Sequence, residues 1–336
     1  MHAIITYLAY PWLAGLATTQ AFYMLSLLGV PYAAFGARAL SYIMSLIFCS
    51  LYGVFASIVL RLFGMEHSAQ HTVARAFQFL MRILTNIKVE IEDPHNYLGT
   101  VRPAVFIGPH QSELDILVLG AVFPKHCSVT AKASLKKMPV LGWFMSLSGS
   151  VFIDRANSKS ARGAMQGAAD EMKRRGQSVW MFPEGTRSYA EDAGLLPFKK
   201  GAFHLAVQAG VPIVPVVVAN YADVFSMKRW VFNSGTVLIK GRFALCHFPL
   251  TLFLFELATN YDLVLPPIDT KNLTSTDVED LTRDTRDLMV KTMLELTAKQ
   301  RGRPVKLDAK LAAMAEVGRN GVIKASGIQA TTASLS

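Results

Sequence analysis

The sequence predicts an α/β fold, a mostly buried mixed sheet flanked by helices and preceded by one or two N-terminal membrane helices. The N-terminal segment 1–63 consists of long runs without charged side chains. After about residue 101, short β-rich runs alternate with helical stretches, a pattern typical of a buried sheet covered by helices. Of the 336 residues, 51% are hydrophobic and 17% charged, whereas an ordinary soluble domain has roughly 25% charged residues.

The N-terminal segment 1–63 is predicted to be embedded in a membrane. Residues 3–37 carry no charge, and a second uncharged run, 39–60, lies between Arg38 and Arg61. Each run covers the roughly 20 residues that a spanning helix needs. No basic region precedes the first run, which disfavours a cleaved signal peptide. The alternatives are one spanning helix with one shallow helix, or a buried core hairpin.

The segment 64–300 is predicted to form the α/β domain, on the cytosolic side because basic residues follow the second apolar run. Strands are predicted at 104–107, 128–131, 151–153, 179–182, 213–218 and 236–239. Helices are predicted at 114–123, 158–175, 201–208 and 277–297. The segment 301–336 is rich in Ala, Ser, Thr and Gly with little periodicity, which predicts a disordered tail.

The net charge of +10 favours an anionic partner, which includes nucleic acid, an anionic membrane surface and phosphate-bearing substrates. The sequence has no zinc-finger spacing and no basic run interleaved with aromatic residues, so we expect a membrane and a phosphorylated substrate and no nucleic acid. The three cysteines, Cys49, Cys127 and Cys246, are far apart, which disfavours a disulfide framework and a structural zinc site.

A histidine and an aspartate five residues apart follow the first predicted strand of the domain. On one continuous helix, His110 and Asp115 would be separated by about 140°, so they meet only if His110 lies in the preceding turn. Ser112 and Asp115 have capping-box spacing, which would start the helix at Ser112 and leave His110 on the loop. A histidine oriented by a carboxylate can deprotonate a hydroxyl. Taken alone, the spacing favours a packed histidine beside a helix-capping aspartate.

A polar loop, residues 182–188, follows the apolar strand predicted at 179–182, where open α/β sheets bind ligands. Gly185 allows the backbone to turn close to a ligand, and Arg187 offers a bidentate fork for phosphate. In this candidate binding loop, Thr186 and Ser188 add hydroxyl donors, and Glu184 would orient an arginine or bind a substrate hydroxyl. A surface loop with a Glu–Arg ion pair is an equal alternative on this pattern alone.

Two further segments carry weaker signals. The strand predicted at 151–153 ends in Asp154 and Arg155, and Arg155 is a second candidate phosphate ligand or one half of a surface ion pair. The apolar run 211–216 favours a core strand, with the lining of an acyl site as the alternative.

In this order, the four segments resemble the motif blocks of the glycerolipid acyltransferase family, and most closely the fungal type of 1-acyl-sn-glycerol-3-phosphate acyltransferase. The matching blocks are His110-x4-Asp115, the segment 152–155 with Arg155, the segment 182–187, and the segment 211–215. The resemblance runs from about residue 89 to about residue 296. Four ordered blocks are far more specific than any one of them, so they outweigh the alternatives given for each.

The resemblance implies that His110, oriented by Asp115, removes the proton of the free sn-2 hydroxyl of lysophosphatidic acid. The alkoxide then attacks the thioester of acyl-CoA to give phosphatidic acid, with no covalent acyl-enzyme, metal or resident cofactor. Arg155 and Arg187, with Lys199 or Lys200, would hold the phosphate of the acceptor. The family also implies the endoplasmic reticulum membrane, with the catalytic domain facing the cytosol.

Two features depart from the family pattern. Pro109 stands where the family often has asparagine, and proline restricts the loop and removes one backbone N–H. The segment 241–263 interrupts an otherwise continuous run from Lys240 to Val264. It is either a real insertion or, as we favour, a translated intron; a mature transcript containing these codons would refute the intron.

Three other functions are weighed against this expectation. An acyltransferase for another acceptor, such as glycerol 3-phosphate or another lysophospholipid, has the same motifs. A lipid serine hydrolase is disfavoured because the chain contains no G-x-S-x-G sequence. A non-catalytic membrane adaptor is disfavoured by the intact His110 and Asp115 pair.

Overall fold

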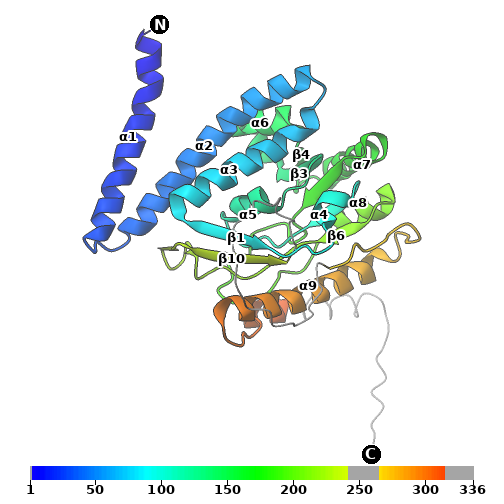
Figure 1. Ribbon diagram of the computed structural model, residues 1–336. Helices are drawn as coiled ribbons and strands as arrows, with labels where there is room; N and C mark the ends of the chain where they lie inside the picture. The colour runs from blue at the N-terminus through cyan, green and yellow to red at the C-terminus, as the bar shows by residue number, and fades with distance from the viewer. Residues whose placement is uncertain (1, 241–264, 315–336) are drawn as a thin grey trace, which may run out of the picture.

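The computed structural model describes residues 2–240 and 265–314, and it has the predicted α/β architecture (Figure 1). The helices are α1 (His2–Leu27), α2 (Ala33–Leu62), α3 (Ala69–Thr85), α4 (Tyr97–Thr100), α5 (Asp115–Val122), α6 (Leu141–Leu147), α7 (Ser158–Arg175), α8 (Gly201–Ala209) and α9 (Val278–Arg301), with short 3-10 segments η1 (Glu66–Ser68) and η2 (Ala133–Lys137). The strands are β1 (Ile87–Ile91), β2 (Val105–Ile107), β3 (Cys127–Lys132), β4 (Val151–Ile153), β5 (Ser178–Met181), β6 (Ile213–Pro215), β7 (Val217–Val218), β8 (Phe225–Ser226), β9 (Val231–Phe232) and β10 (Gly235–Lys240).

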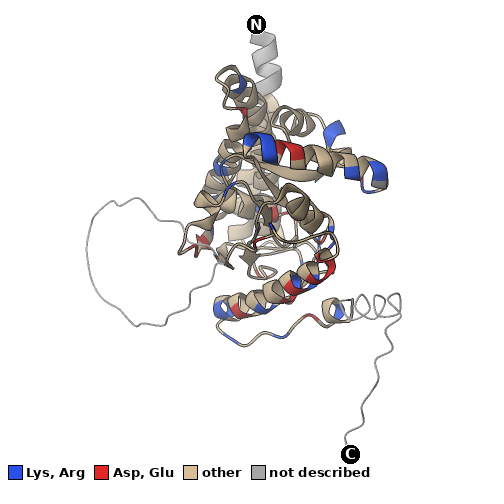
Figure 2. Ribbon diagram, turned by 90° about the vertical axis from the view of Figure 1, so that its right-hand side faces the viewer, with Lys and Arg blue, Asp and Glu red and all other residues tan. Residues whose placement is uncertain are grey.

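The main sheet is parallel and has the order β4-β3-β5-β2-β6. Its central strand β5 and the neighbouring strand β2 are buried along their whole length, as expected when helices cover both faces. Alternate residues of the strands face opposite layers. Phe106, Trp180 and Val214 pack in one core with α3 and α5. Ile107, Met181 and Ile213 pack in the other with α7, α8 and α9, and the outer face of α9 carries charges of both signs (Figure 2).

A smaller sheet has the order β1-β10-β7, in which β10 is parallel to β1 and antiparallel to β7. The single strand predicted at 213–218 is therefore wrong in one respect, because this run divides between the two sheets. The division follows Pro215, which has no N–H to donate to a neighbouring strand. The strand β1 is not among the elements that the sequence predicts.

The N-terminal residues form two long helices, and α1 stands away from the α/β body (Figure 1). Among the described residues, α2 is the helix that is long and apolar enough to cross a membrane. Its buried residues are mostly small and include Ser41, Ser45 and Gly53, whereas its exposed residues include Ile47 and Phe55. An exposed apolar face of this kind agrees with association with a membrane.

The chain beyond α9 differs from the predicted disorder as far as it is described. The N–H of Asp308 donates to the carbonyl of Ala193 at 2.9 Å. Leu311 is buried at 3% exposure and contacts the backbone region of Gly194. The buried side chain of Leu311 and the backbone hydrogen bond of Asp308 thus pack residues 302–314 against the α/β domain. Residues 315–336, and the segment 241–263 with its predicted insertion, lie outside the described residues.

The close approach of α2 to α6 depends on a residue without a side chain. A Cβ atom at Gly53 would lie 2.5 Å from Cδ2 of Phe144, whereas one at Gly167 on α7 would meet nothing within 4 Å. We expect Gly53→Ala to destabilise the protein by about 1–3 kcal/mol through overpacking. The matched Gly167→Ala should stabilise it by about 0.5–1 kcal/mol through helix propensity. Thermal unfolding of both variants in one detergent measures this, and equal shifts would contradict the packing.

Candidate active site

His110 and Asp115 meet through the turn between β2 and α5. The Nδ1–H of His110 donates to Oδ2 of Asp115 at 2.7 Å. The same oxygen accepts the backbone N–H groups of Gln111 at 2.9 Å and Ser112 at 3.2 Å, so the carboxylate also caps the turn. The helix begins at Asp115 and not at Ser112, because residues 112–114 form a tighter turn first. His110 lies before the helix, as the sequence predicts.

The ring of His110 is fixed on two sides. Phe182 stacks on it with ring centroids 4.3 Å apart and an interplanar angle of 18°. Because Nδ1 carries the proton shared with Asp115, Nε2 is the ring nitrogen that remains to accept a proton. The side chain of His110 is 18% exposed and lines a cavity. The pair therefore has the tautomer and the access that a general base needs.

The turn that carries His110 (residues 108–114, the first motif loop) and the loop 182–188 (the second motif loop) are hydrogen-bonded to each other along their backbones. Ser188 donates its N–H to the carbonyl of His110 at 2.9 Å, and Tyr189 donates to that of Gln111 at 3.0 Å. Glu184 is buried and accepts the N–H of His110 at 2.6 Å on one oxygen and that of Leu196 at 2.8 Å on the other. The position of His110 thus depends on the loop that follows β5.

Burial raises the pKa of Glu184 to about 8, and the nearby Asp115 charge acts in the same direction, against the two backbone donors and Arg286. Glu184 is predicted to contact an arginine or a substrate hydroxyl. In the structure its carboxyl instead bonds to backbone N–H groups of the site loops and does not line the cavity. The sequence shows an acid after a strand but not the direction in which it points.

The two candidate phosphate ligands meet at the loop 182–188. Arg187 belongs to this loop, and Arg155 reaches it from the end of β4. Arg155 follows β4 and donates to the carbonyl of Gly185, which adopts φ +70°. Arg187 forms an ion pair with Glu113, with Nη1 3.2 Å from Oε1. The hydroxyl of Tyr189 donates to the same carboxylate oxygen at 2.7 Å. Glu113, which is itself bonded to Tyr189, therefore holds the guanidinium of Arg187 near the pair formed by His110 and Asp115, called the dyad below.

A cavity of about 510 Å³ joins these groups to an apolar interior. Its polar end is lined by His110, Lys132, Arg155, Thr186 and Arg187. Its apolar part is formed by residues of α2, α3, α5 and α6, among them Leu46, Val73, Phe77, Leu119, Phe144 and Met145. This arrangement suits a ligand with a hydrocarbon chain at one end and an anionic group at the other.

The structure brings some predicted site residues to the cavity and places others outside its lining. Arg155, Thr186 and Arg187 line the cavity with His110. Glu184, Gly185, Ser188 and Lys199 do not line it. Lys199 is exposed, and its side chain packs over Gly185, while Lys200 pairs with Glu279 at 3.0 Å.

Sequence reasoning misses other residues near the site, among them Glu113, Lys132 and Tyr189. Of these, Lys132 follows a predicted strand directly, and that position is the signal that would have found it.

A family model described as "Acyltransferase" matches residues 87–219. The chain is 39% identical over 259 residues to the 1-acyl-sn-glycerol-3-phosphate acyltransferase of Saccharomyces cerevisiae, covering 77% of each chain. It is 42% identical over 154 residues to the human 1-acyl-sn-glycerol-3-phosphate acyltransferase beta, covering 46% of this chain and 54% of that protein. The crystal structure of the 1-acyl-sn-glycerophosphate acyltransferase PlsC from Thermotoga maritima is similar in fold, with a TM-score of 0.57, 23% identity, and coverage of 85% of this chain and 97% of that one.

The raised pKa of Glu184 predicts a pH dependence of stability. Its folded pKa of about 8 lies above the ordinary value of 4.5, so its contribution is fully present below about pH 4.5 and is lost as the pH rises through about 8. We expect the free energy of unfolding to fall by up to roughly 4 kcal/mol from this group between about pH 5 and about pH 9. Glu184→Gln should be less stable at the lower pH, because an amide oxygen accepts only one of the two donors well, yet should show a smaller fall. Denaturant unfolding across this range tests it; parallel pH profiles would contradict the assignment.

Proposed function

This chain belongs to the acyltransferase family, and on that basis we propose that it transfers a fatty acyl group from acyl-CoA to the free sn-2 hydroxyl of 1-acyl-sn-glycerol 3-phosphate, giving phosphatidic acid. The observation that carries the proposal is the His110–Asp115 pair at the polar end of an apolar cavity that Arg155 and Arg187 also line. The names of the relatives support the same acceptor.

The proposed reaction begins with proton transfer to His110. Nε2 takes the proton of the sn-2 hydroxyl while Asp115 stabilises the imidazolium that forms. The alkoxide oxygen attacks the thioester carbon and forms a tetrahedral intermediate. When the intermediate collapses, the carbon–sulfur bond breaks and the CoA sulfur leaves with the proton from His110. The thioester is reactive enough that this route needs no covalent acyl-enzyme and no metal or resident cofactor.

In the proposed complex, cationic side chains bind the phosphate of the acceptor and an apolar wall binds its acyl chain. Its phosphate is proposed to lie at Arg155 and Arg187, with Thr186 and Lys132 beside it, because all four line the polar end of the cavity. The apolar wall from α2, α3 and α6 supplies the surface that an acyl chain would bury. Fixing the hydroxyl next to His110 in this way lowers the entropic part of the barrier.

The proposed place of action is the membrane of the endoplasmic reticulum, with the α/β domain facing the cytosol. The exposed apolar face of α2 and the contribution of Leu46 and Cys49 on the same helix to the cavity support contact between the lipid phase and the site. A lysolipid and its product are both poorly soluble in water, so a cavity bordered by such a helix suits them.

Loss of the imidazole tests the proposed base. We expect His110→Ala to lower kcat for acylation of lysophosphatidic acid by about 10²–10⁴-fold, because the hydroxyl then lacks its proton acceptor. His204→Ala removes an exposed imidazole on α8, outside the cavity lining, and serves as the matched control with unchanged activity. Mass-spectrometric quantification of phosphatidic acid from several acyl-CoA donors is the measurement. Retention of more than a few per cent of activity by the folded variant would count against the role.

Loss of the Arg187 guanidinium tests the phosphate site. We expect Arg187→Ala to raise KM for lysophosphatidic acid roughly ten- to hundredfold with a smaller change in kcat, because a charge-assisted contact to the bound substrate is lost. Activity with the unphosphorylated acceptor 1-acylglycerol should change little. Arg283→Ala, on the exposed face of α9, is the matched control. An unchanged KM would place the phosphate elsewhere.

A further inference from the structure

A buried tyrosine outside the two motif loops contacts the carboxyl group of the dyad. Tyr221 lies in the turn after β7, just beyond the residues 87–219 that the family model matches, and it is 1% exposed. Its hydroxyl donates to Oδ1 of Asp115 at 2.5 Å and lies 3.0 Å from the hydroxyl of Ser112. Asp115 therefore uses Oδ2 for His110 and the backbone of the turn, and Oδ1 for Tyr221.

The direction of this hydrogen bond follows from the surroundings of the phenol. Burial raises the pKa of Tyr221 well above its ordinary value, and the neighbouring charge of Asp115 raises it further. The phenol therefore keeps its proton across the working pH range and acts as a donor to the carboxylate. A donor of this kind stabilises the negative charge of Asp115 and removes one of its rotational freedoms.

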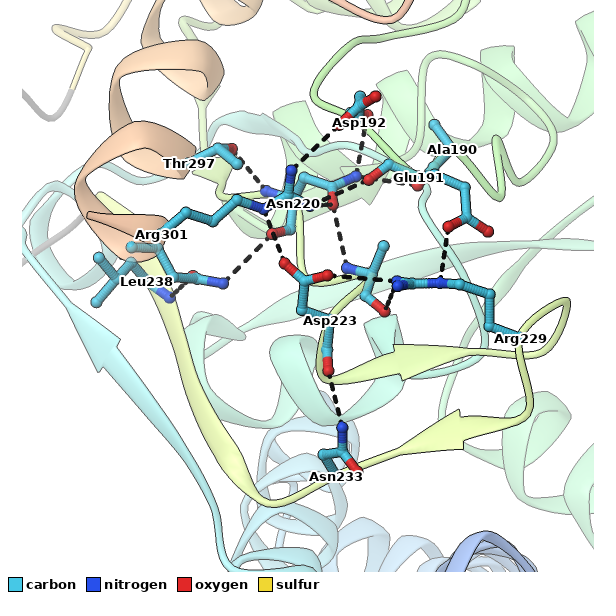
Figure 3. A network of polar contacts seen from close by, with 12 residues as sticks. Ala190, Glu191, Asp192, Asn220, Asp223, Arg229, Asn233, Leu238, Thr297 and Arg301 are labelled. Carbon is cyan, nitrogen blue, oxygen red and sulfur yellow. Dashed lines mark hydrogen bonds and ion pairs between the residues drawn. The ribbon is translucent and has the colours of Figure 1, made fainter. Parts of the chain in front are cut away.

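Asn220, the residue before Tyr221, is hydrogen-bonded to α9 and to the chain at residues 190–192 (Figure 3). The N–H of Asn220 donates to Oγ1 of Thr297 on α9 at 2.9 Å. Its side-chain amide donates to the carbonyls of Ala190 at 3.0 Å and Asp192 at 3.1 Å, just after the second motif loop. Its Oδ1 accepts from Nη2 of Arg301 at 2.9 Å, at the end of α9.

These bonds connect three segments that are distant in sequence. The last turns of α9, the chain at 190–192 and the turn that carries Tyr221 meet at one buried amide, since Asn220 is itself 1% exposed. The backbone beside Tyr221 is consequently anchored to these three segments, while its hydroxyl lies between Oδ1 of Asp115 and the hydroxyl of Ser112, which favours one orientation of the phenol.

We propose that Tyr221 is a positioning residue, which donates to Asp115 and so controls how the carboxylate holds His110 and how strongly it attracts the proton that the imidazole takes up. The inference rests on the proposed general-base role of His110 and deepens it. Without the phenol donor, the charge on Oδ1 is uncompensated, and Asp115 attracts the imidazolium more strongly. With a stronger donor at the same place, the attraction is weaker.

The other charged and titratable groups near the pair come from three elements. Glu184 accepts the N–H of His110 from the loop after β5. Glu113 pairs with Arg187 beside the turn and accepts from the hydroxyl of Tyr189 at 2.7 Å, and its carbonyl accepts from Tyr42 on α2 at 2.8 Å. None of these groups bonds to the hydroxyl of Tyr221, so a change confined to that hydroxyl leaves them in place.

Tyr221→Phe tests the proposal by removing only the hydroxyl. We expect the acid limb of the kcat/KM profile to move upward by about half a pH unit. We also expect kcat to fall roughly three- to thirtyfold, less than the about 10²–10⁴-fold that loss of a general base costs. Tyr23→Phe is the matched control, because it removes a phenol that donates to the carbonyl of Leu84, remote from the site.

A second readout does not depend on acyl transfer. Diethylpyrocarbonate reacts with the neutral imidazole of histidine and not with the protonated imidazolium, and mass spectrometry of the peptide that contains His110 follows modification at this residue. The pH at which its modification is half-maximal should move upward in Tyr221→Phe and stay in place in Tyr23→Phe. A shift in this chemical titration without acyl transfer by the wild-type protein would refute the proposed function while supporting the positioning role.

Replacement of Tyr221 by 3-fluorotyrosine keeps the hydroxyl and makes it a stronger donor. Both midpoints should then move downward, opposite to Tyr221→Phe, which a residue that only fills space would not produce. If Tyr221→Phe does not unfold cooperatively, the 3-fluorotyrosine protein, which keeps the hydroxyl, tests the proposal in its place. Midpoints that stay unchanged in the 3-fluorotyrosine protein, or that move upward in it, would overturn the inference.

Discussion

The hydrogen bond between His110 and Asp115 depends on the polypeptide leaving β2 without entering a helix at once. A continuous helix would separate the two side chains by about 140°. The turn before α5 is stabilised by the same carboxylate, which accepts the N–H groups of Gln111 and Ser112 in addition to the imidazole. One side chain thus shapes the backbone and orients the proposed base, so the local fold and the chemistry of the site are coupled.

The parallel sheet collects the rest of the site at one edge. The loops after β2, β4 and β5 carry His110, Arg155 and Arg187, and carboxyl ends of parallel strands lie on the same side. The apolar half of the cavity has a different origin, because α2, α3, α5 and α6 form it. Within the part of the chain that the structure describes, the helix long and apolar enough to cross a membrane, α2, is therefore also a wall of the proposed active site.

Burial separates the residues that support the site from those that face the cavity. Glu184 and Tyr221 are almost fully buried, and each bonds to one member of the dyad or its backbone. Arg187 remains about one third exposed and is paired with Glu113. A partly exposed arginine can exchange a carboxylate for a phosphate at low cost, whereas a buried acid bonded to two backbone N–H groups cannot be released.

The sequence by itself determined the alternation of strands and helices, the apolar N-terminal helices and the position of His110 on the loop before a helix, since these features follow from the spacing of nearby residues. Only the tertiary structure decided that the run 213–218 serves two sheets, that Glu184 supports a loop, and that Tyr221 reaches Asp115 across 106 positions of the chain. Local spacing reports hydrogen bonds and faces within a few residues. Partners distant in sequence depend on how the layers pack, which no short pattern records.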